Sequence, residues 1–252
     1  MVTCGSRLWC ASLPGRTSTT PLAKIPLRIA QISDVHLGPI LGRPFAEHLA
    51  RRIEALAPDL VAITGDLVDG DAARVADEVA PLARLRAPHG VYFVTGNHDY
   101  YSGADAWAAY VTALGLRPLR NARVTIGAGA AAFDLAGVED HHAHIFNPAQ
   151  RSDVQAALAG RDPTRPLVLL AHDPLTFKEA ATLGVDLQLS GHTHGGQIWP
   201  VCYLVRLSTP FVAGHYRRGD SQLFVSRGTG FWGPAIRLFA PAEIVEIRIV
   251  RG

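Results

Sequence analysis

Short apolar runs, each about five residues long, recur along most of the chain and alternate with amphipathic, alanine-rich segments. Runs of this length are typical of buried strands, and the longer segments between them have the pattern of helices that cover a sheet. The alternation predicts an α/β fold with helices on the faces of a sheet. We expect strands at residues 27–33, 59–64, 90–95, 130–136, 166–171, 187–190, 222–226 and 243–249. We expect helices at residues 44–57, 72–86, 103–114, 150–159 and 175–183.

The later strands have fewer helices between them. Because parallel neighbours need long crossover connections, we expect either one mixed sheet or two sheets packed face to face between helix layers. Residues 1–26 differ from the rest, with three prolines, a Ser/Thr cluster and no periodicity. Such a segment is typical of a poorly ordered lead-in. A single folded domain is therefore expected over residues 27–252.

Composition and charge narrow the class of protein. Apolar residues make up 48% of the chain and charged residues 18%, as in a folded rather than a disordered protein. The 24 basic and 22 acidic residues give a formal net charge of +2, so long nucleic acid is not an expected partner. Three cysteines without a CxxC pair favour a reducing, cytoplasmic compartment. No run approaches the roughly 20 apolar residues that cross a bilayer, and residues 1–26 lack the apolar core of a signal peptide.

Residues that commonly bind metal ions follow five of the predicted strands. Proteins with α/β sheets bind substrates and cofactors at the carboxyl ends of the strands, so residues at these positions are candidates for a binding or catalytic site. A single Asp or His after a strand is more often a turn former or a helix cap, but capping gives no reason for histidine in four of the five segments. The segments are Asp34-Val35-His36, Gly65-Asp66, Gly96-Asn97-His98-Asp99, His172-Asp173 and Gly191-His192-Thr193-His194.

These segments offer imidazole and carboxylate ligands and no thiolate. That set suits Mn, Fe or Zn better than Ca or Mg, which prefer oxygen ligands. Seven ligands are too many for one ion, but they suffice for two divalent ions about 3.5–4 Å apart that share a carboxylate and a water. Two such ions leave the pocket positive enough to attract phosphate anions. The expected ligands are Asp34, His36, Asp66, Asn97, His172, His192 and His194.

The order of the five motifs resembles that of the calcineurin-like metallophosphoesterases, over about residues 27–249. The segment Gly191-His192-Thr193-His194-Gly195-Gly196-Gln197, with Val225-Ser226-Arg227-Gly228, is similar to a bacterial branch of often membrane-associated phosphoesterases. The resemblance implies the αββα metallophosphoesterase fold, in which two mixed β-sheets are sandwiched between helices. It also implies that residues 27–252 form the catalytic domain.

The family pattern divides the seven ligands between two metal ions and leaves His98 and Asp99 for catalysis. His98 would face the substrate and contact the phosphoryl oxygen or protonate the leaving group, a role typically worth about 10²–10⁴ in rate. Asp99 would orient the ring of His98, and Asp66 would bridge the two ions. By this pattern, Asp34, His36 and His194 hold the first ion, and Asn97, His172 and His192 hold the second.

The expected activity is hydrolysis of a phosphodiester, pyrophosphate or phosphomonoester bond by attack of a metal-bridging hydroxide. The substrate is expected to be a small or lipidic phosphoester, since the chain shows no insertion typical of protein docking. Two alternatives remain, a catalytically silent binding module with the same fold and a Mn-dependent nuclease. Members of the bacterial branch often carry membrane-spanning helices, so peripheral membrane association is the alternative to a purely cytoplasmic location.

Two weaker signals lie outside the ligand motifs. His141, His142 and His144 form a tract that we expect to be a loop at the pocket rim, because the seven-ligand set is already complete. Aromatic residues concentrate after the last motif, and we expect them to pack in the core, with a wall for an acyl chain or a nucleobase as the alternative. These aromatic residues are Trp199, Phe211, Tyr216, Phe231 and Trp232.

Overall fold

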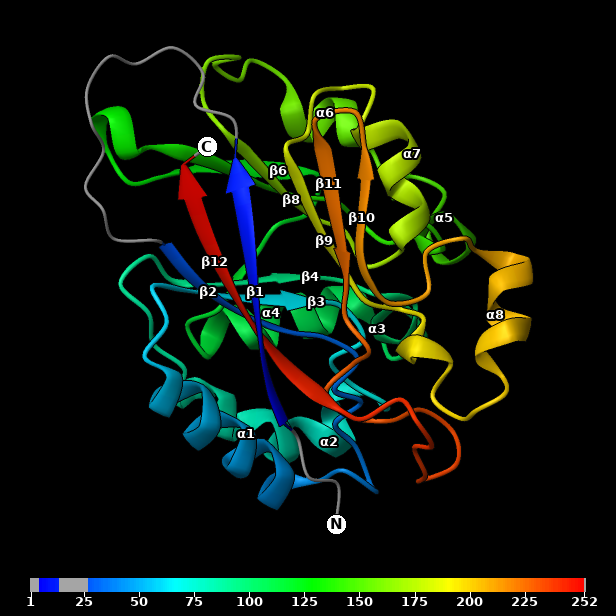
Figure 1. The fold of residues 1–252 in the computed structure, drawn as a ribbon. Coiled ribbons are helices and arrows are strands. Elements are labelled where there is room, and N and C mark those ends of the chain that lie inside the picture. The colour runs from blue at the N-terminus through cyan, green and yellow to red at the C-terminus, as the bar shows by residue number, and fades with distance from the viewer. Residues whose placement is uncertain (1–4, 14–26, 252) are drawn as a thin grey trace.

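Two six-stranded mixed sheets pack against each other in the computed structural model of the protein, which describes residues 5–13 and 27–251 (Figure 1). The first sheet has the order β1 (Gly5–Leu13), β12 (Glu243–Arg251), β2 (Leu27–Ile32), β3 (Leu60–Thr64), β4 (Val91–Val94) and β5 (Arg117–Pro118). The second has the order β10 (Gly214–Arg218), β11 (Ser221–Val225), β9 (Leu187–Ser190), β8 (Leu167–Leu170), β7 (Phe133–Gly137) and β6 (Ala122–Ile126). The two-sheet arrangement confirms the αββα fold.

Helices cover the outer face of each sheet (Figure 1). The α-helices are α1 (Arg43–Leu56), α2 (Ala72–Val79), α3 (Asn97–Tyr101), α4 (Ala104–Ala113), α5 (Ala143–Phe146), α6 (Val154–Leu158), α7 (Phe177–Ala180) and α8 (Cys202–Ser208). Short 3-10 turns lie at Ala80–Arg84, Gly129–Ala131, Pro174–Thr176 and His194–Gly196. Among the described residues, no helix is long and apolar enough to cross a membrane.

Successive side chains of the central strands enter different cores. Ile29 of β2 packs between the two sheets, whereas its neighbour Ala30 packs against α1, α2 and α4. On the far side, Leu167 of β8 packs with α6 and α7, while Val168 faces the first sheet. Both faces of these strands are therefore covered, which explains why their sequences are continuous apolar runs.

All eight predicted strands and the five predicted helical regions are present, with shifted bounds. The region predicted as 72–86 divides into α2 and a 3-10 turn at Ala80–Arg84, where Pro81 cannot donate the backbone hydrogen bond of a continuing α-helix. Four strands were not predicted. They are β1, β5, β6 and β10, which are the four edge strands of the two sheets.

The prediction of a poorly ordered lead-in is wrong for residues 5–13. This segment forms β1, which runs parallel to β12 from Gly5 beside Glu243 to Leu13 beside Arg251. Trp9 also packs against Phe224 of the second sheet, with ring centroids 5.1 Å apart. The pairing joins segments at opposite ends of the chain, so local periodicity does not reveal it. Residues 1–4 and 14–26 lie outside the described residues, and a domain boundary at residue 27 stays a prediction.

Candidate metal centre

The loops that follow five strands bring the seven predicted ligands together. They meet where the carboxyl ends of strands from the two sheets lie side by side. The loops after β2, β3 and β4 supply ligands from the first sheet, and those after β8 and β9 supply the others. Hydrogen bonds join the two sheets at this point. Nδ1 of His172 lies 2.8 Å from the carbonyl oxygen of Thr64, and the amide of His192 donates to Oδ1 of Asp34 at 3.0 Å.

One group of ligand atoms belongs to Asp34, His36 and His194, all of which are buried. Nε2 of His36 lies 3.1 Å from Nε2 of His194, which in turn lies 3.2 Å from Oδ1 of Asp34. Nδ1 of His36 is hydrogen-bonded to another carboxylate, so its Nε2 is left to point into the group. Partners of this kind on the far ring nitrogen are typical of metal-binding histidines.

A second group contains Asp66, His172 and His192, with Asn97 beside it. Oδ2 of Asp66 lies 3.1 Å from Nε2 of His172, and Nδ1 of His192 lies 3.0 Å from Oδ1 of Asn97. The same Oδ2 of Asp66 is 3.9 Å from Nε2 of His36, which belongs to the first group. Asp66 therefore lies between the two groups.

The donors fit divalent cations. In each group one ligand atom per residue lies within 4.8 Å of the others. Nitrogen ligands about 2.1 Å from a Zn-sized ion lie roughly 3 Å apart when they are at right angles. The nitrogen separation of 3.1 Å in the first group and 3.3 Å between His172 and His192 in the second match this spacing. Imidazole and carboxylate together suit Mn, Fe or Zn.

Five of the seven predicted ligands have left-handed backbone conformations, which are uncommon for residues other than glycine. Each typically costs on the order of 1–3 kcal/mol, so the cluster is a feature that the surrounding packing must hold in place. The bent backbone turns successive side chains toward one point at the end of each strand. The φ angles are 51° at Asp34, 51° at His36, 50° at Asp66, 74° at His192 and 53° at His194.

Glycines precede three of the ligands because the loops approach one another closely. A Cβ atom on Gly191 would overlap Oγ of Ser33 and the carboxylate of Asp34. A Cβ atom on Gly96 would overlap the carboxylate of Asp66. The glycines in the Gly96-Asn97 and Gly191-His192 pairs are therefore required by space at the metal centre.

Electrostatic interactions keep the buried aspartates ionised, as metal coordination requires. Burial by itself would raise the pKa of Asp66, but the charge and hydrogen bond of His172 outweigh burial and lower the pKa to about 2. Burial likewise opposes ionisation of Asp34, but His194 holds the pKa of Asp34 well below its usual range. For His172, burial would lower the pKa, but Asp66 raises it well above its ordinary value.

The predicted role of Asp99 in orienting His98 is wrong. Oδ1 of Asp99 accepts hydrogen bonds from the amides of Leu67 and Val68 at 2.9 and 3.2 Å, and Oδ2 accepts one from Gly96 at 2.8 Å. Asp99 is completely buried and ties the loop after β3 to the start of α3. Its carboxyl group thus stabilises the backbone of the loop that carries Asp66.

The carboxylate beside His98 is Asp69, which the sequence analysis missed. Oδ1 of Asp69 lies 2.7 Å from Nδ1 of His98 and 2.9 Å from Nδ1 of His36. Burial would raise the pKa of Asp69, but hydrogen bonds from both histidines hold it well below its usual range. The signal available in the sequence was a second aspartate three positions after Asp66 in the same loop.

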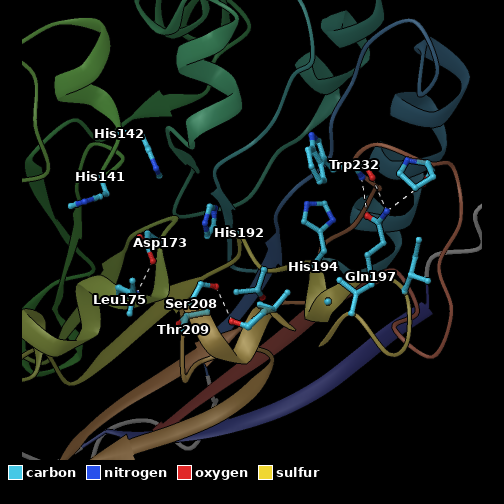
Figure 2. A pocket seen from close by; sticks show the side chains of 16 residues that line it. His141, His142, Asp173, Leu175, His192, His194, Gln197, Ser208, Thr209 and Trp232 are labelled. Carbon is cyan, nitrogen blue, oxygen red and sulfur yellow. Dashed lines mark hydrogen bonds between the residues drawn. The ribbon is translucent and has the colours of Figure 1, made fainter. Parts of the chain in front are cut away.

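A cavity of about 480 Å³ opens beside His192 and His194 (Figure 2). His141 and His142 also line it, as predicted for a loop at the rim, and Nδ1 of His142 lies 3.0 Å from Oδ1 of buried Asp140. The prediction is wrong for His144, which belongs to helix α5 and does not line the cavity. Apolar side chains form much of the remaining wall. They are Leu175, Ile198, Val201, Val205, Trp232 and Pro234.

The prediction that the late aromatic residues pack in the core is wrong for two of them. Trp199 is 52% exposed and Trp232 is 54% exposed, whereas Phe231 is buried as predicted. Trp232 lies at the cavity, and its ring centroid is 5.9 Å from that of His98. Trp232 is thus the one of these five aromatic residues that lines the cavity, and its role as a wall for an acyl chain or a nucleobase stays a prediction.

Comparison with known proteins places these features in a family. The sequence model of the calcineurin-like phosphoesterases matches residues 27–196. A Bos taurus protein named transmembrane protein with metallophosphoesterase domain is 41% identical over 247 residues, which cover 92% of this chain and 56% of that protein. An uncharacterized metallophosphoesterase of Aquifex aeolicus is 34% identical over 88% of this chain and 85% of its own length.

A solved structure shares the fold. The NAD nucleotidase of Haemophilus influenzae superimposes with a TM-score of 0.52 at 14% identity, covering 81% of this chain and 45% of that chain. The present chain spans little more than half the length of several curated relatives, including those from Bos taurus and Danio rerio.

Proposed function

Because this chain belongs to the calcineurin-like phosphoesterase family, we propose that it is a dinuclear metal-dependent phosphoesterase. The observation that carries the proposal is the position of Asp66 between two ligand groups, 3.1 Å from Nε2 of His172 and 3.9 Å from Nε2 of His36. One carboxylate placed in this way would serve both ions. The proposed ligands are those that the motifs predicted, namely Asp34, His36 and His194 for one ion, Asn97, His172 and His192 for the other, and Asp66 for both.

When bound, two such cations lower the pKa of a water nucleophile and neutralise the charge on the phosphoryl oxygens. The protein contributes the positions of the groups around them. Nδ1 of His36 is occupied by Asp69, and Nδ1 of His172 by Thr64, which leaves Nε2 of each ring to coordinate. The carboxylate of Asp99 accepts two backbone hydrogen bonds from the loop that carries Asp66 and a third from Gly96, and so ties that loop to the start of α3.

His98 is the proposed catalytic residue that contacts the substrate. Its amide donates to Oδ1 of Asp66 at 2.8 Å, and its ring lies at the site with partial exposure. Asp69 holds Nδ1, so Nε2 is the nitrogen left to meet a phosphoryl or leaving-group oxygen. A positioned imidazole can donate a proton to that oxygen as the phosphoester bond breaks.

We propose a small or lipidic phosphoester as the substrate. The cavity adjoins His192 and His194 at its polar end, and side chains such as Leu175, Val201 and Val205 form its apolar wall. A phosphate at the polar end with an apolar group against this wall would match both regions. The names of relatives from Bos taurus and Danio rerio also support a membrane setting.

The function is tested by hydrolysis of bis-p-nitrophenyl phosphate and p-nitrophenyl phosphate with Mn²⁺ and with a chelator. We expect hydrolysis that requires Mn²⁺ and is lost in chelator, with the preferred ester distinguishing diesterase from monoesterase activity. A protein that binds two Mn²⁺ ions per chain and hydrolyses neither ester nor any lipid phosphoester would be a binding module. Preferential cleavage of single-stranded DNA or RNA in Mn²⁺ would assign it as a nuclease.

Replacing either residue of the His98–Asp69 pair should lower turnover, and His98→Ala should leave the metal ions in place. We expect His98→Ala to reduce kcat by about 10²-fold, because general acid catalysis is lost. We expect Asp69→Asn to reduce kcat by about tenfold and to weaken metal binding at His36, because Asp69 orients both rings and the substitution keeps an oxygen acceptor but removes the charge. Metal content by elemental analysis is the accompanying measurement. His98 also lies in a group with His36 and Asp66 that could hold an ion, so loss of one metal ion in His98→Ala would make His98 a ligand instead.

A further inference from the structure

An exposed apolar surface borders the cavity on the side of α8. We call this surface the apolar rim, formed by Trp199, Tyr203, Leu204, Leu207, Ile236 and Phe239. Each is more than half exposed, with Leu207 at 85% and Phe239 at 82%. Its parts are continuous, since the Trp199 amide donates to the Leu238 carbonyl at 3.0 Å and the rings of Trp199 and Phe239 lie 6.4 Å apart.

Helix α8 separates the cavity from this surface. Three residues at helical spacing line the cavity. They are Val201, at the amino-terminal end of the helix, Val205 and Ser208. Leu204 and Leu207 occupy the positions between and are 65% and 85% exposed. No residue of α8 is buried, and Figure 1 shows this helix projecting at one edge of the molecule. A helix with apolar residues on both faces, one of which is exposed to solvent, indicates a surface that a partner covers.

The charge around the apolar rim favours an anionic partner. Asp220 is the only acidic residue between Leu187 and Ala242. It lies in the turn between β10 and β11, at the opposite end of β11 from the metal centre. Arg206 is exposed on α8, with its guanidinium 5.8 Å from the centre of the Tyr203 ring. Exposed Trp and Tyr with Arg beside aliphatic side chains is the composition of surfaces that lie at the boundary of a bilayer.

A second pair of apolar residues continues the rim past His98. The ring of Tyr101 lies 5.2 Å from that of His98 and 5.4 Å from that of Phe146, and both Tyr101 and Phe146 are exposed. The ring of His98 therefore contacts those of both Tyr101 and Trp232. Exposed apolar side chains therefore lie beside His98 as well as on α8, which lines the cavity.

We propose that the apolar rim docks on an anionic lipid bilayer and that the cavity receives a phosphoester that belongs to a lipid of that bilayer. The second part rests on the proposed function. Leu204, Leu207 and Phe239 enter the apolar part of the bilayer, and Arg206 contacts lipid phosphates. The lipid head group then reaches His192 and His194 along the wall made by α8 (Figure 2).

The test is sedimentation of the metal-loaded chain with phosphatidylcholine vesicles and with vesicles that also contain phosphatidylglycerol. We expect the wild type to bind the anionic vesicles. We expect the Leu204→Ser/Leu207→Ser variant to lower the partition coefficient by at least about tenfold, because it lacks the two leucines that enter the apolar part of the bilayer. Arg206→Gln should lower it about fivefold on anionic vesicles only. The matched control is Leu8→Ser, which removes a leucine that is 53% exposed on β1, outside the rim.

Bound Mn²⁺ per chain, measured on the same samples, verifies that the variants are folded. Absence of wild-type binding to either kind of vesicle would overturn the docking proposal. So would a wild-type dimer in light scattering that the double variant loses, because a second copy would then cover the rim. Vesicle binding without hydrolysis of any phosphoester would leave docking standing and overturn the proposed enzymatic function, so the two failures are distinguishable.

Discussion

Asp66→Ala is expected to lower kcat/KM for the preferred ester by about 10⁴-fold or more. Stabilisation by the two cations is worth several kcal/mol, and 1.4 kcal/mol corresponds to a factor of ten. One carboxylate oxygen of Asp66 lies near imidazole nitrogens of both groups, at 3.1 Å from Nε2 of His172 and 3.9 Å from Nε2 of His36. Its other oxygen accepts the His98 amide at 2.8 Å, so the substitution also releases the proposed catalytic residue.

The measurement for Asp66→Ala is kcat/KM together with Mn²⁺ per chain. We expect the bound metal to fall from two ions to one or none. Asp220→Asn is the matched control, because its carboxylate is 94% exposed and lies far from the metal centre, and it should change neither quantity. Full activity with two bound ions in Asp66→Ala would contradict the bridging role and require another residue to join the groups.

Gly191→Ala is expected to lower activity by about 10³-fold and to destabilise the fold, although it adds a single methyl group. The added carbon would overlap Oγ of Ser33 and the carboxylate of Asp34, and the amide of the next residue donates to that same carboxylate. Either β9 or the Asp34 side chain must move, which displaces a proposed ligand from its position. Overpacking of this kind costs about 3 kcal/mol, or roughly 10 °C in Tm for a chain of this size.

Thermal unfolding and metal content with and without Mn²⁺ test this prediction. Gly5→Ala is the control, since nothing lies within 4 Å of the position that its Cβ would take. The control should bind as much metal as the wild type and keep Tm within about 1 °C of it, because its added methyl group meets no other atom. If Gly191→Ala bound two ions with an unchanged Tm, the close approach of the two sheets at this point would not hold in solution.

The grouping of the candidate metal ligands could be predicted largely from residues 27–196, because their positions follow a general rule. Carboxyl ends of neighbouring parallel strands meet at one sheet edge, so ligands placed there come together without knowledge of the side-chain packing. Asp34, Asp66 and His172 were found in this way, and they lie in the two groups of the structure. The core strands could be predicted for a related reason, since burial on both faces leaves a continuous apolar run.

The carboxylate that partners His98 could not be assigned from distance along the sequence. Asp99 is adjacent to His98 in the chain, but the first turn of α3 directs it back to the amides of Gly96, Leu67 and Val68. Asp69 is 29 positions from His98 and reaches Nδ1 because β3 and β4 are neighbouring strands. Contact between side chains depends on direction and strand pairing, and neither is visible in a list of neighbours along the chain.

The sequence by itself therefore predicted an α/β fold and a set of strand-end residues that could bind metal, because strand burial and strand-end position leave local patterns. These patterns left open one mixed sheet or two packed sheets, and the two-sheet sandwich was implied by the family resemblance. Only the tertiary structure decided that β1 pairs with β12, that Asp69 is the partner of His98, and that α8 is left without a buried face. Each of these depends on which distant segments meet. An apolar residue has the same sequence signal in a core as on the exposed rim of a cavity, so the packing of the whole chain assigns Leu207 and Trp232 to the surface.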